Sequence, residues 1–338
     1  MHTIFSEPDE PIAGKRYIYD QIMDWVLLKK KLCFSEMTNI SQPVQADLEK
    51  KYTLNTLSVA DIQADSDDIT KFLFVLRGSK PEVKVESVFI PGRGRITACL
   101  STQSGCACGC VFCATGQVGP GRNLHFSEII LQLLNMEKKQ EKRVSHIVLM
   151  GMGEPLHNYQ QVVKTIEFLE KSKLRISARR ITLSTIGLPA QIRKLTDDGV
   201  RVELAVSLHS AIEEKRKKLI PYKGLSSIDE LMKAVDYFYI KTKRLPTFEY
   251  VMIKDLNDRQ EDIKALAELL KHRPCKVNLI AMNGKINGHE SPAKKVAEEF
   301  CSSLNKKGIK TTIRRSAGSG INAACGQLRG KIRQDQQD

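Results

Sequence analysis

Long apolar runs, internal repeats and low-complexity segments are all absent from this chain of 338 residues. No stretch approaches the roughly 18 consecutive apolar residues that a membrane-spanning helix needs. The N-terminus also lacks a basic segment followed by an apolar one, which is the pattern of a secretory signal peptide. We therefore expect a cytoplasmic protein without membrane contact.

Acidic residues are fewer than basic residues in this chain. Against 53 Lys and Arg stand 39 Asp and Glu, which leaves a formal net charge of +14. A pI near 9.3, with basic residues spread over many segments, suits a polyanionic partner, most simply a nucleic acid. A protein with a basic surface and no such partner has the same composition, so charge alone does not decide. Hydrophobic residues make up 41% of the chain, which supports a sizeable core and excludes wholesale disorder.

Short apolar runs alternate with longer amphipathic stretches from about residue 84 onward. The predicted strands cover residues 85–90, 96–101, 147–150, 180–184, 202–207, 248–252, 276–280 and 311–313. The predicted helices between them cover residues 127–142, 159–171, 189–198, 228–242, 259–271 and 292–307. This alternation is typical of βα units and a parallel sheet, either open or closed into a barrel.

The first 80 residues follow a different pattern. Apolar residues recur at helical spacing from Tyr17 to Leu28, and residues 41–51 favour a second helix. Extended structure is expected to return only at about residue 66. We therefore predict two domains, a helical one over residues 1–80 and an α/β one over residues 81–338.

Cysteine is unevenly distributed, because five of the nine residues lie close together. They are Cys99, Cys106, Cys108, Cys110 and Cys113. In a cytosolic chain of this size such a cluster indicates metal or redox chemistry and not a disulfide framework.

The spacing within the cluster, Cys106-x3-Cys110-x2-Cys113, places three thiolates on one short loop. Three thiolates can hold three irons of a 4Fe–4S cube and leave the fourth iron open to a substrate or cofactor. A structural zinc usually takes its ligands from two separated pairs. The only second pair here would be Cys108 with a close neighbour, so zinc is the weaker alternative.

Phe112 stands just before the last cysteine, and CxxxCxxC in this form is the signature of the radical S-adenosylmethionine (SAM) superfamily. Further motifs are LMGMGEPLHN at 149–158, LSTIG at 183–187, VSLHS at 206–210, VNLIAMN at 277–283, INAACGQL at 321–328 and FSEMTN at 34–39. Together they resemble the RlmN/Cfr family of radical-SAM RNA adenine methyltransferases nearly end to end. The resemblance implies an α/β fold, the incomplete (β/α)6 barrel of radical-SAM enzymes, over residues 81–338. It makes residues 1–80 a small helical accessory domain that binds RNA.

The resemblance also implies a 4Fe–4S cluster on Cys106, Cys110 and Cys113, and two SAM molecules per turnover. In the family, the first SAM methylates a cysteine near the C-terminus, which aligns with Cys325. The second is cleaved, with an electron from an external donor, to an adenosyl radical that takes a hydrogen from the S-methyl group. The resulting methylene radical then adds to an amidine carbon of adenine, because C2 and C8 are not nucleophilic enough for direct methylation by SAM.

Two further residues complete the implied chemistry. Cys99 matches the family's resolving thiol, which releases the product by forming a transient disulfide with Cys325. Glu86 matches the proposed acceptor of the ring proton. The expected SAM-binding residues are Gly153, Glu154, Ser184, Ser207, Leu208, His209 and Asn283. Of these, Gly153 and Glu154 would hold the amino group, and His209 is assigned no proton transfer.

The RNA contacts are less sharply defined by the sequence. Candidates for phosphate binding are the basic residues 29–31, Arg93, Arg95, Arg122, Arg179, Arg180, Arg314 and Arg315. Two departures from the family pattern stand out. Cys108 is an extra thiol in the cluster loop, expected to point away from the iron, and Gly320-Ile321-Asn322 replaces an acidic pair.

Three hypotheses on function follow. The first is methylation of C2 of adenine in large-subunit rRNA, and also in tRNA, by a monomer; Pro155 favours this RlmN branch. The second keeps the chemistry but moves it to C8, as in the Cfr branch. The third is a non-catalytic, zinc-containing RNA-binding protein.

Overall fold

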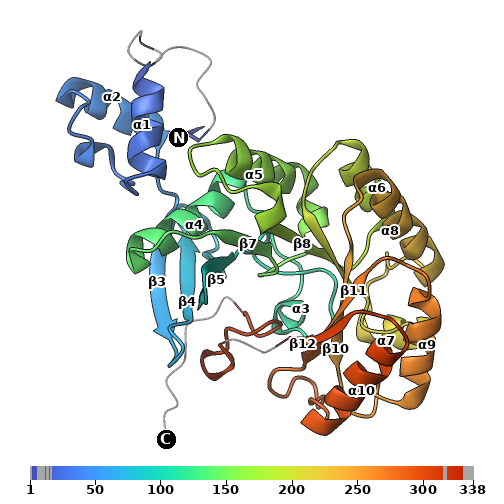
Figure 1. The fold of residues 1–338 in the computed structure, drawn as a ribbon. Helices are drawn as coiled ribbons and strands as arrows, with labels where there is room; N and C mark the ends of the chain where they lie inside the picture. Colours follow the sequence, from blue (N-terminus) through green and yellow to red (C-terminus); the bar gives the residue numbers. More distant parts are fainter. Residues whose placement is uncertain (1, 6–11, 13–14, 16, 315–317, 330–338) are drawn as a thin grey trace, which may run out of the picture.

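The computed structural model describes residues 2–5, 12, 15, 17–314 and 318–329. A ten-stranded sheet runs through it in the order β12-β11-β10-β9-β8-β7-β6-β5-β4-β3 (Figure 1). The strands are β3 (Leu57–Ala64), β4 (Thr70–Leu76), β5 (Val83–Gly92), β6 (Arg95–Cys99), β7 (His146–Leu149), β8 (Ile181–Thr185), β9 (Glu203–Ser207), β10 (Thr247–Met252), β11 (Lys276–Ala281) and β12 (Thr311–Arg314).

Strands β6 to β12 pair in chain order, and every pair among them is parallel. Each crossover therefore adds the next strand on the same side, which curls the sheet toward a barrel. No pairing joins β12 to the other edge of the sheet in the described residues, so the barrel stays open. This confirms the predicted incomplete α/β barrel.

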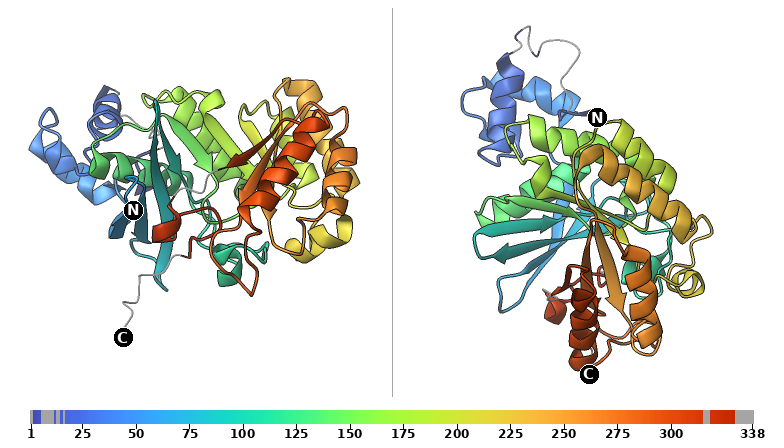
Figure 2. Two further views of the ribbon diagram at one scale, coloured as in Figure 1. Left: turned by 60° about the horizontal axis from the view of Figure 1, so that its bottom comes forward. Right: turned by 45° about the vertical axis from the view of Figure 1, so that its right-hand side comes forward.

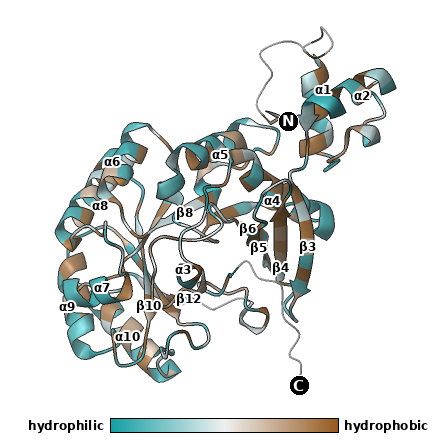
Figure 3. Cartoon of the chain, turned by 180° about the vertical axis from the view of Figure 1, so that it is seen from behind, coloured by the Kyte–Doolittle hydropathy of each residue, from teal (hydrophilic) through white to brown (hydrophobic). Residues whose placement is uncertain are grey.

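Helices cover the outside of the curved sheet (Figures 1 and 2). They are α4 (Phe126–Gln140), α5 (Tyr159–Lys171), α6 (Pro189–Asp197), α7 (Glu213–Leu219), α8 (Ile228–Thr242), α9 (Gln260–Leu270) and α10 (Lys294–Lys306). Each buries one apolar stripe; in α10 it consists of Ala297, Phe300 and Leu304. Figure 3 shows the result, with brown strands such as β4 and largely teal outer helices such as α9.

The N-terminal region is helical over a shorter length than predicted. It contains α1 (Tyr17–Leu27), a 3₁₀ turn η2 (Phe34–Glu36) and α2 (Gln42–Lys51), with a short parallel pair of β1 (His2–Thr3) and β2 (Tyr52–Thr53). Strands β3 and β4 follow, and both belong to the main sheet. Because β4 pairs with β5 from Thr70↔Phe89 to Leu76↔Val83, the sheet continues across the domain boundary proposed at residue 80.

The segment after β12 returns across the open side of the barrel, as Figure 1 shows. Its backbone is held by hydrogen bonds from Ala114 N to Gly326 O (2.6 Å) and from Thr115 Oγ1 to Leu328 O (2.7 Å). These contacts seat the neighbouring Cys325 inside the barrel. Among the described helices, none has the length and apolar character that crossing a membrane would require.

Candidate active site

The cysteine loop lies between β6 and the short helix α3 (Ala114–Val118). Cys106, Cys110 and Cys113 line one cavity at the carboxyl ends of the parallel strands. Burial raises the pKa of Cys110 and of Cys113, and the neighbouring thiols raise both further. Crowded thiols of this kind suit a bound metal, because a cation stabilises the thiolates that otherwise repel one another. The loop therefore fits an iron–sulfur cluster.

Cys108 lines the same cavity as the other three thiols, and the expectation that it points away from the iron stays a prediction. A hydrogen bond between the side chains of Cys106 and Cys108 lowers the pKa of Cys106, and the same contact raises the pKa of Cys108. That only the other three cysteines hold the cluster stays a prediction.

Glycines let the loops of this site pack closely. A Cβ on Gly116, in α3, would lie 2.9 Å from the backbone nitrogen of Cys110. Gly153 has a φ of +101°, and a Cβ there would lie 2.6 Å from Cβ of Gln103. Any larger residue would push the cysteine loop or the turn after β7 out of place.

Glu154 follows in that turn, where its carboxylate is buried. It accepts hydrogen bonds from the backbone nitrogens of Ile186 (2.8 Å) and Leu156 (3.0 Å). Burial nevertheless raises its pKa to about 7. A buried carboxylate that lines a cavity and has neutral donors around it is a good partner for a ligand cation. Glu154 therefore fits the amino group of SAM.

The other expected SAM residues fall into two groups. Ser184, Ser207, His209 and Asn283 line the same cavity as Glu154. Leu208 does not, because its side chain is fully buried in the core. Burial and the nearby Arg216 lower the pKa of His209 to about 3, while its Nδ1 accepts a hydrogen bond from Val251 N (3.0 Å). Its ring is therefore fixed by the backbone of β10 at the wall of the cavity, and that it transfers no proton stays a prediction.

Cys99 and Cys325, 226 positions apart in the chain, line one larger cavity inside the barrel. Cys325 also lines the cavity of the cluster loop, so it stands where the two meet. Both are free thiols. Burial, and then the proximity of Cys325, raise the pKa of Cys99 to about 12. The structure thus brings together the two thiols that the sequence had singled out.

Two residues that the sequence analysis did not place in the active site line both cavities. Arg314 is half-buried, and its charge lowers the pKa of Cys99, while Cys325 and Glu249 raise the pKa of Arg314 itself. Glu249 is buried in β10, where Asn278 Nδ2 donates to its Oε1 (3.1 Å) and its Oε2 has no hydrogen-bond partner among the described residues. A charged residue between Phe248 and Tyr250 in an apolar strand was the available signal, since unpaired acids are rarely buried.

Glu86, the expected proton acceptor, is buried beside the larger cavity but is not among the residues that line it. Its carboxylate contacts Lys71 Nζ (3.2 Å) and accepts a hydrogen bond from Arg329 N (2.6 Å). Arg329 directly follows Leu328, which does line the cavity. Glu86 therefore contacts the C-terminal segment next to the cavity, and its role stays a prediction.

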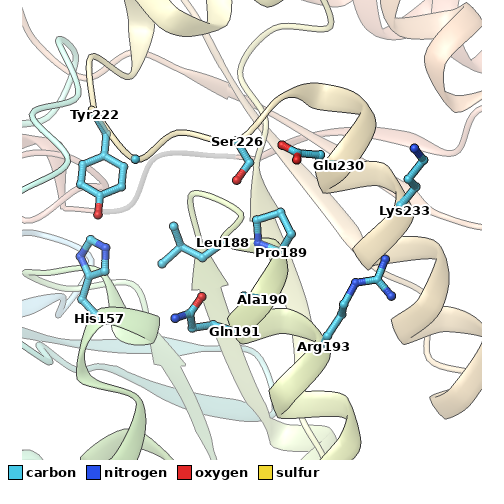
Figure 4. Close-up of a pocket in the computed structure, with 11 residues that line it drawn as sticks. His157, Leu188, Pro189, Ala190, Gln191, Arg193, Tyr222, Ser226, Glu230 and Lys233 are labelled. Carbon is cyan, nitrogen blue, oxygen red and sulfur yellow. The ribbon is translucent and has the colours of Figure 1, made fainter.

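A second hollow lies outside the barrel, around the start of α6 (Figure 4). His157 and Tyr222 face each other at one end of it, with ring centroids 5.2 Å apart, and Arg193 and Lys233 lie at the other. None of the cysteines and none of the expected SAM residues line this hollow. The chemistry is therefore concentrated inside the barrel.

Comparison with known proteins first defines the class. Residues 100–282 match the family model described as the Radical SAM superfamily. The open barrel, the cysteine loop and this match together define a radical SAM enzyme, which uses a 4Fe–4S cluster and SAM.

The relatives define the family within that class. The "Probable dual-specificity RNA methyltransferase RlmN" of Thermotoga neapolitana is 44% identical over 317 residues, which cover 93% of this chain and 92% of the relative. The protein of the same name from Christiangramia forsetii is 40% identical over 325 residues, or 94% and 92% of the two chains. A crystal structure of a radical SAM methyltransferase from Sphaerobacter thermophilus matches with a TM-score of 0.90 and 34% identity, covering 94% of each chain. This chain belongs to the RlmN family of SAM-dependent methyltransferases.

Proposed function

We propose that this protein methylates C2 of adenine in large-subunit rRNA and in tRNA through a methylated Cys325. The observation that carries the proposal is the placement of Cys99 and Cys325 in one cavity that adjoins the cluster loop. Relatives named dual-specificity RNA methyltransferases support an RNA substrate. We expect the protein to act on this RNA in the cytoplasm and as a monomer.

The cluster and SAM, when bound and supplied with an electron from an external donor, provide the adenosyl radical. The protein contributes the carbon carrier. The thiolate of Cys325 takes a methyl group from the first SAM, so that S-adenosylhomocysteine leaves and a thioether remains. Loss of one hydrogen atom turns this S-methyl group into the methylene group that adds to adenine. Cys325 lies where the two cavities meet, so its side chain can face both the radical source and the RNA.

Product release needs a second thiol and a base. Cys99 attacks the sulfur of Cys325, which forms the S–S bond and breaks the bond between that sulfur and the new carbon. The electron pair of the broken bond stays with the carbon, which takes up a proton and becomes the product methyl group. Before this cleavage the adduct loses its ring proton to a base, for which Glu86 is the candidate, and its unpaired electron to an external one-electron acceptor, which leaves a closed-shell thioether between Cys325 and the new carbon. Arg314, which lowers the pKa of Cys99, supports formation of the attacking thiolate.

The test is anaerobic reconstitution with iron, sulfide and methyl-labelled SAM, followed by incubation with rRNA and tRNA fragments. Nucleoside mass spectrometry should then find labelled 2-methyladenosine. Labelled 8-methyladenosine would instead support the C8 hypothesis. A colourless protein that binds zinc but no iron or sulfide would support the non-catalytic RNA-binding protein.

A further inference from the structure

The cavity that holds Cys99 and Cys325 extends to the opposite end of the barrel. Its volume is about 720 Å³. At the amino ends of the strands it is lined by Arg95, which begins β6, by Arg179 and Arg180, which precede β8, and by Lys276, which begins β11. We call these four residues the basic mouth.

The positive charges of the basic mouth are not neutralised within the described residues. None of the four residues forms an ion pair with another described residue. Arg95, Arg179 and Arg180 are exposed to solvent. Glu203 lines the same end of the cavity, but its carboxylate is engaged by Arg244 at 2.8 Å. The pKa of His146, at the start of β7, is lowered by burial and then by Arg180 and Arg95. The positive charges of the basic mouth therefore help to lower the pKa of the neighbouring imidazole of His146.

A second basic region lies between the end of α1 and helices α4 and α5. Its lining residues include Lys29, Lys30, Lys31, Lys138, Lys142, Arg143 and Lys173, which we call the lysine cleft. Four of these seven residues are engaged in ion pairs, with three carboxylates between them. The ion pairs are Lys30–Glu137, Lys31–Glu36, Lys138–Glu36 and Lys173–Asp24. The lysine cleft is also separate from the cavity of the thiols, whereas the basic mouth opens directly into it.

We propose that the basic mouth binds the phosphates of the RNA strand on either side of the target adenine, so that the base enters the barrel from the amino ends of the strands. The proposal rests on the proposed function, because it takes the nucleobase to Cys325. Arginine suits this task, since its planar guanidinium binds a phosphate through two hydrogen bonds. A base that is taken out of its stack leaves its flanking phosphates at the rim of the pocket.

The other arginine candidates are less well placed. Arg93 is exposed in the turn between β5 and β6 but does not line the cavity, and Arg122 is paired with Glu128. Arg314 is half-buried beside Cys99 and Cys325, and Arg315 lies outside the described residues.

The experiment compares two double variants with the same change in charge. In R179Q/R180Q two members of the basic mouth are neutralised. In K294Q/K295Q the charge is removed from the outer side of α10, where the two lysine side chains are 91% and 86% exposed. Binding of a fluorescent RNA stem-loop is measured by anisotropy over a range of salt concentrations, and methylation of the same RNA gives KM.

We expect R179Q/R180Q to bind the RNA about tenfold more weakly at low salt. Its salt slope should be smaller by about 0.7 for each phosphate that the variant no longer binds. Its KM for RNA should rise by a similar factor to the loss of affinity. R179K/R180K keeps the charge and should recover most of the affinity, and K294Q/K295Q should match the wild type within about twofold. Because Arg179 and Arg180 are exposed, thermal unfolding of all variants should coincide.

Two results would overturn the inference. One is an R179Q/R180Q variant that binds and methylates RNA as well as K294Q/K295Q does. The other is a loss of binding confined to K29Q/K142Q in the lysine cleft. Failure of the proposed function is distinct, because then the wild-type enzyme itself would leave adenine unmethylated.

Discussion

The two ends of the barrel interior are built in different ways. At the carboxyl ends of the strands, short contiguous motifs supply the cysteine loop and the turn of Gly153 and Glu154, and glycines allow their backbones to meet. At the amino ends, basic residues at the starts of three different strands line the cavity, and no short motif unites them. The comparison shows that precise chemistry needs a defined backbone, whereas attraction of a polyanion needs only charge at roughly the right place.

The largest effects are expected at the two thiols that lie between these ends. Cys325→Ala cannot carry the methyl group and should form neither product nor a covalent RNA adduct. Cys99→Ala can still form the carbon bridge but lacks the releasing thiol, so protein should remain attached to RNA. Denaturing electrophoresis with labelled RNA, and mass analysis of the cross-linked peptide with methyl-labelled SAM, distinguish the two. Equal behaviour of the variants, or an adduct without the labelled carbon, would contradict the assigned roles.

The next largest effect concerns the cluster loop. Cys110→Ala should lose the iron–sulfur cluster, because its thiol is one of the three at the x3, x2 spacing. Cys108→Ala should keep iron content and SAM cleavage near the wild-type level, although it removes the hydrogen bond to Cys106. Iron and sulfide analysis after anaerobic reconstitution gives the answer. A cluster that survives in Cys110→Ala and disappears in Cys108→Ala would mean that Cys108, and not Cys110, is the ligand.

A pH effect should appear at Glu154. Its pKa is raised from 4.5 to about 7 in the folded protein, so the folded state holds a proton that the unfolded chain releases. The stability of the cluster-free protein should therefore fall as pH rises from 4.5 to about 7, by roughly 3 kcal/mol from this group. Glu154→Gln should lose this part of the pH dependence, whereas Glu299→Gln, on the exposed side of α10, should keep it. Urea unfolding at pH 5 and 7.5 measures the difference, and parallel curves for Glu154→Gln and wild type would refute the assignment.

The smallest of these effects is expected at Arg314. Arg314→Gln removes a cation that lowers the pKa of Cys99 and should slow product release about tenfold, in keeping with the size of charge-assisted interactions. The trapped RNA adduct would then accumulate transiently, as a weaker form of the Cys99→Ala result. Arg314→Lys should release product at close to the wild-type rate. Quench-flow sampling on denaturing gels follows the adduct, and identical time courses for Arg314→Gln and wild type would exclude this role.

Most of the barrel could be predicted from the alternation of strands and helices. The predicted helix at 159–171 matches α5, and the predicted strand at 202–207 differs from β9 by one residue. Strand β4 lies where extended structure was expected to return, but the edge strand β3 was missed, because its exposed positions carry Ala60, Ile62 and Ala64 and so break the polar–apolar alternation of a half-buried strand. Its assignment to the sheet depends on the pairing of β4 with β5, which no local pattern reveals.

The sequence by itself determined the cysteine loop, the glycine turn with Glu154 and the family, because these depend on residue types at short, fixed spacings. Only the tertiary structure decided that Cys99 and Cys325 share a cavity, that Glu249 and Arg314 join them, and that Glu86 contacts the C-terminal segment. It also separated the basic mouth, which opens into the cavity of the thiols, from the lysine cleft, which does not. The physical reason is that charge and reactivity depend on which distant groups become neighbours, and that is set by the curl of the sheet and the return of the chain after β12.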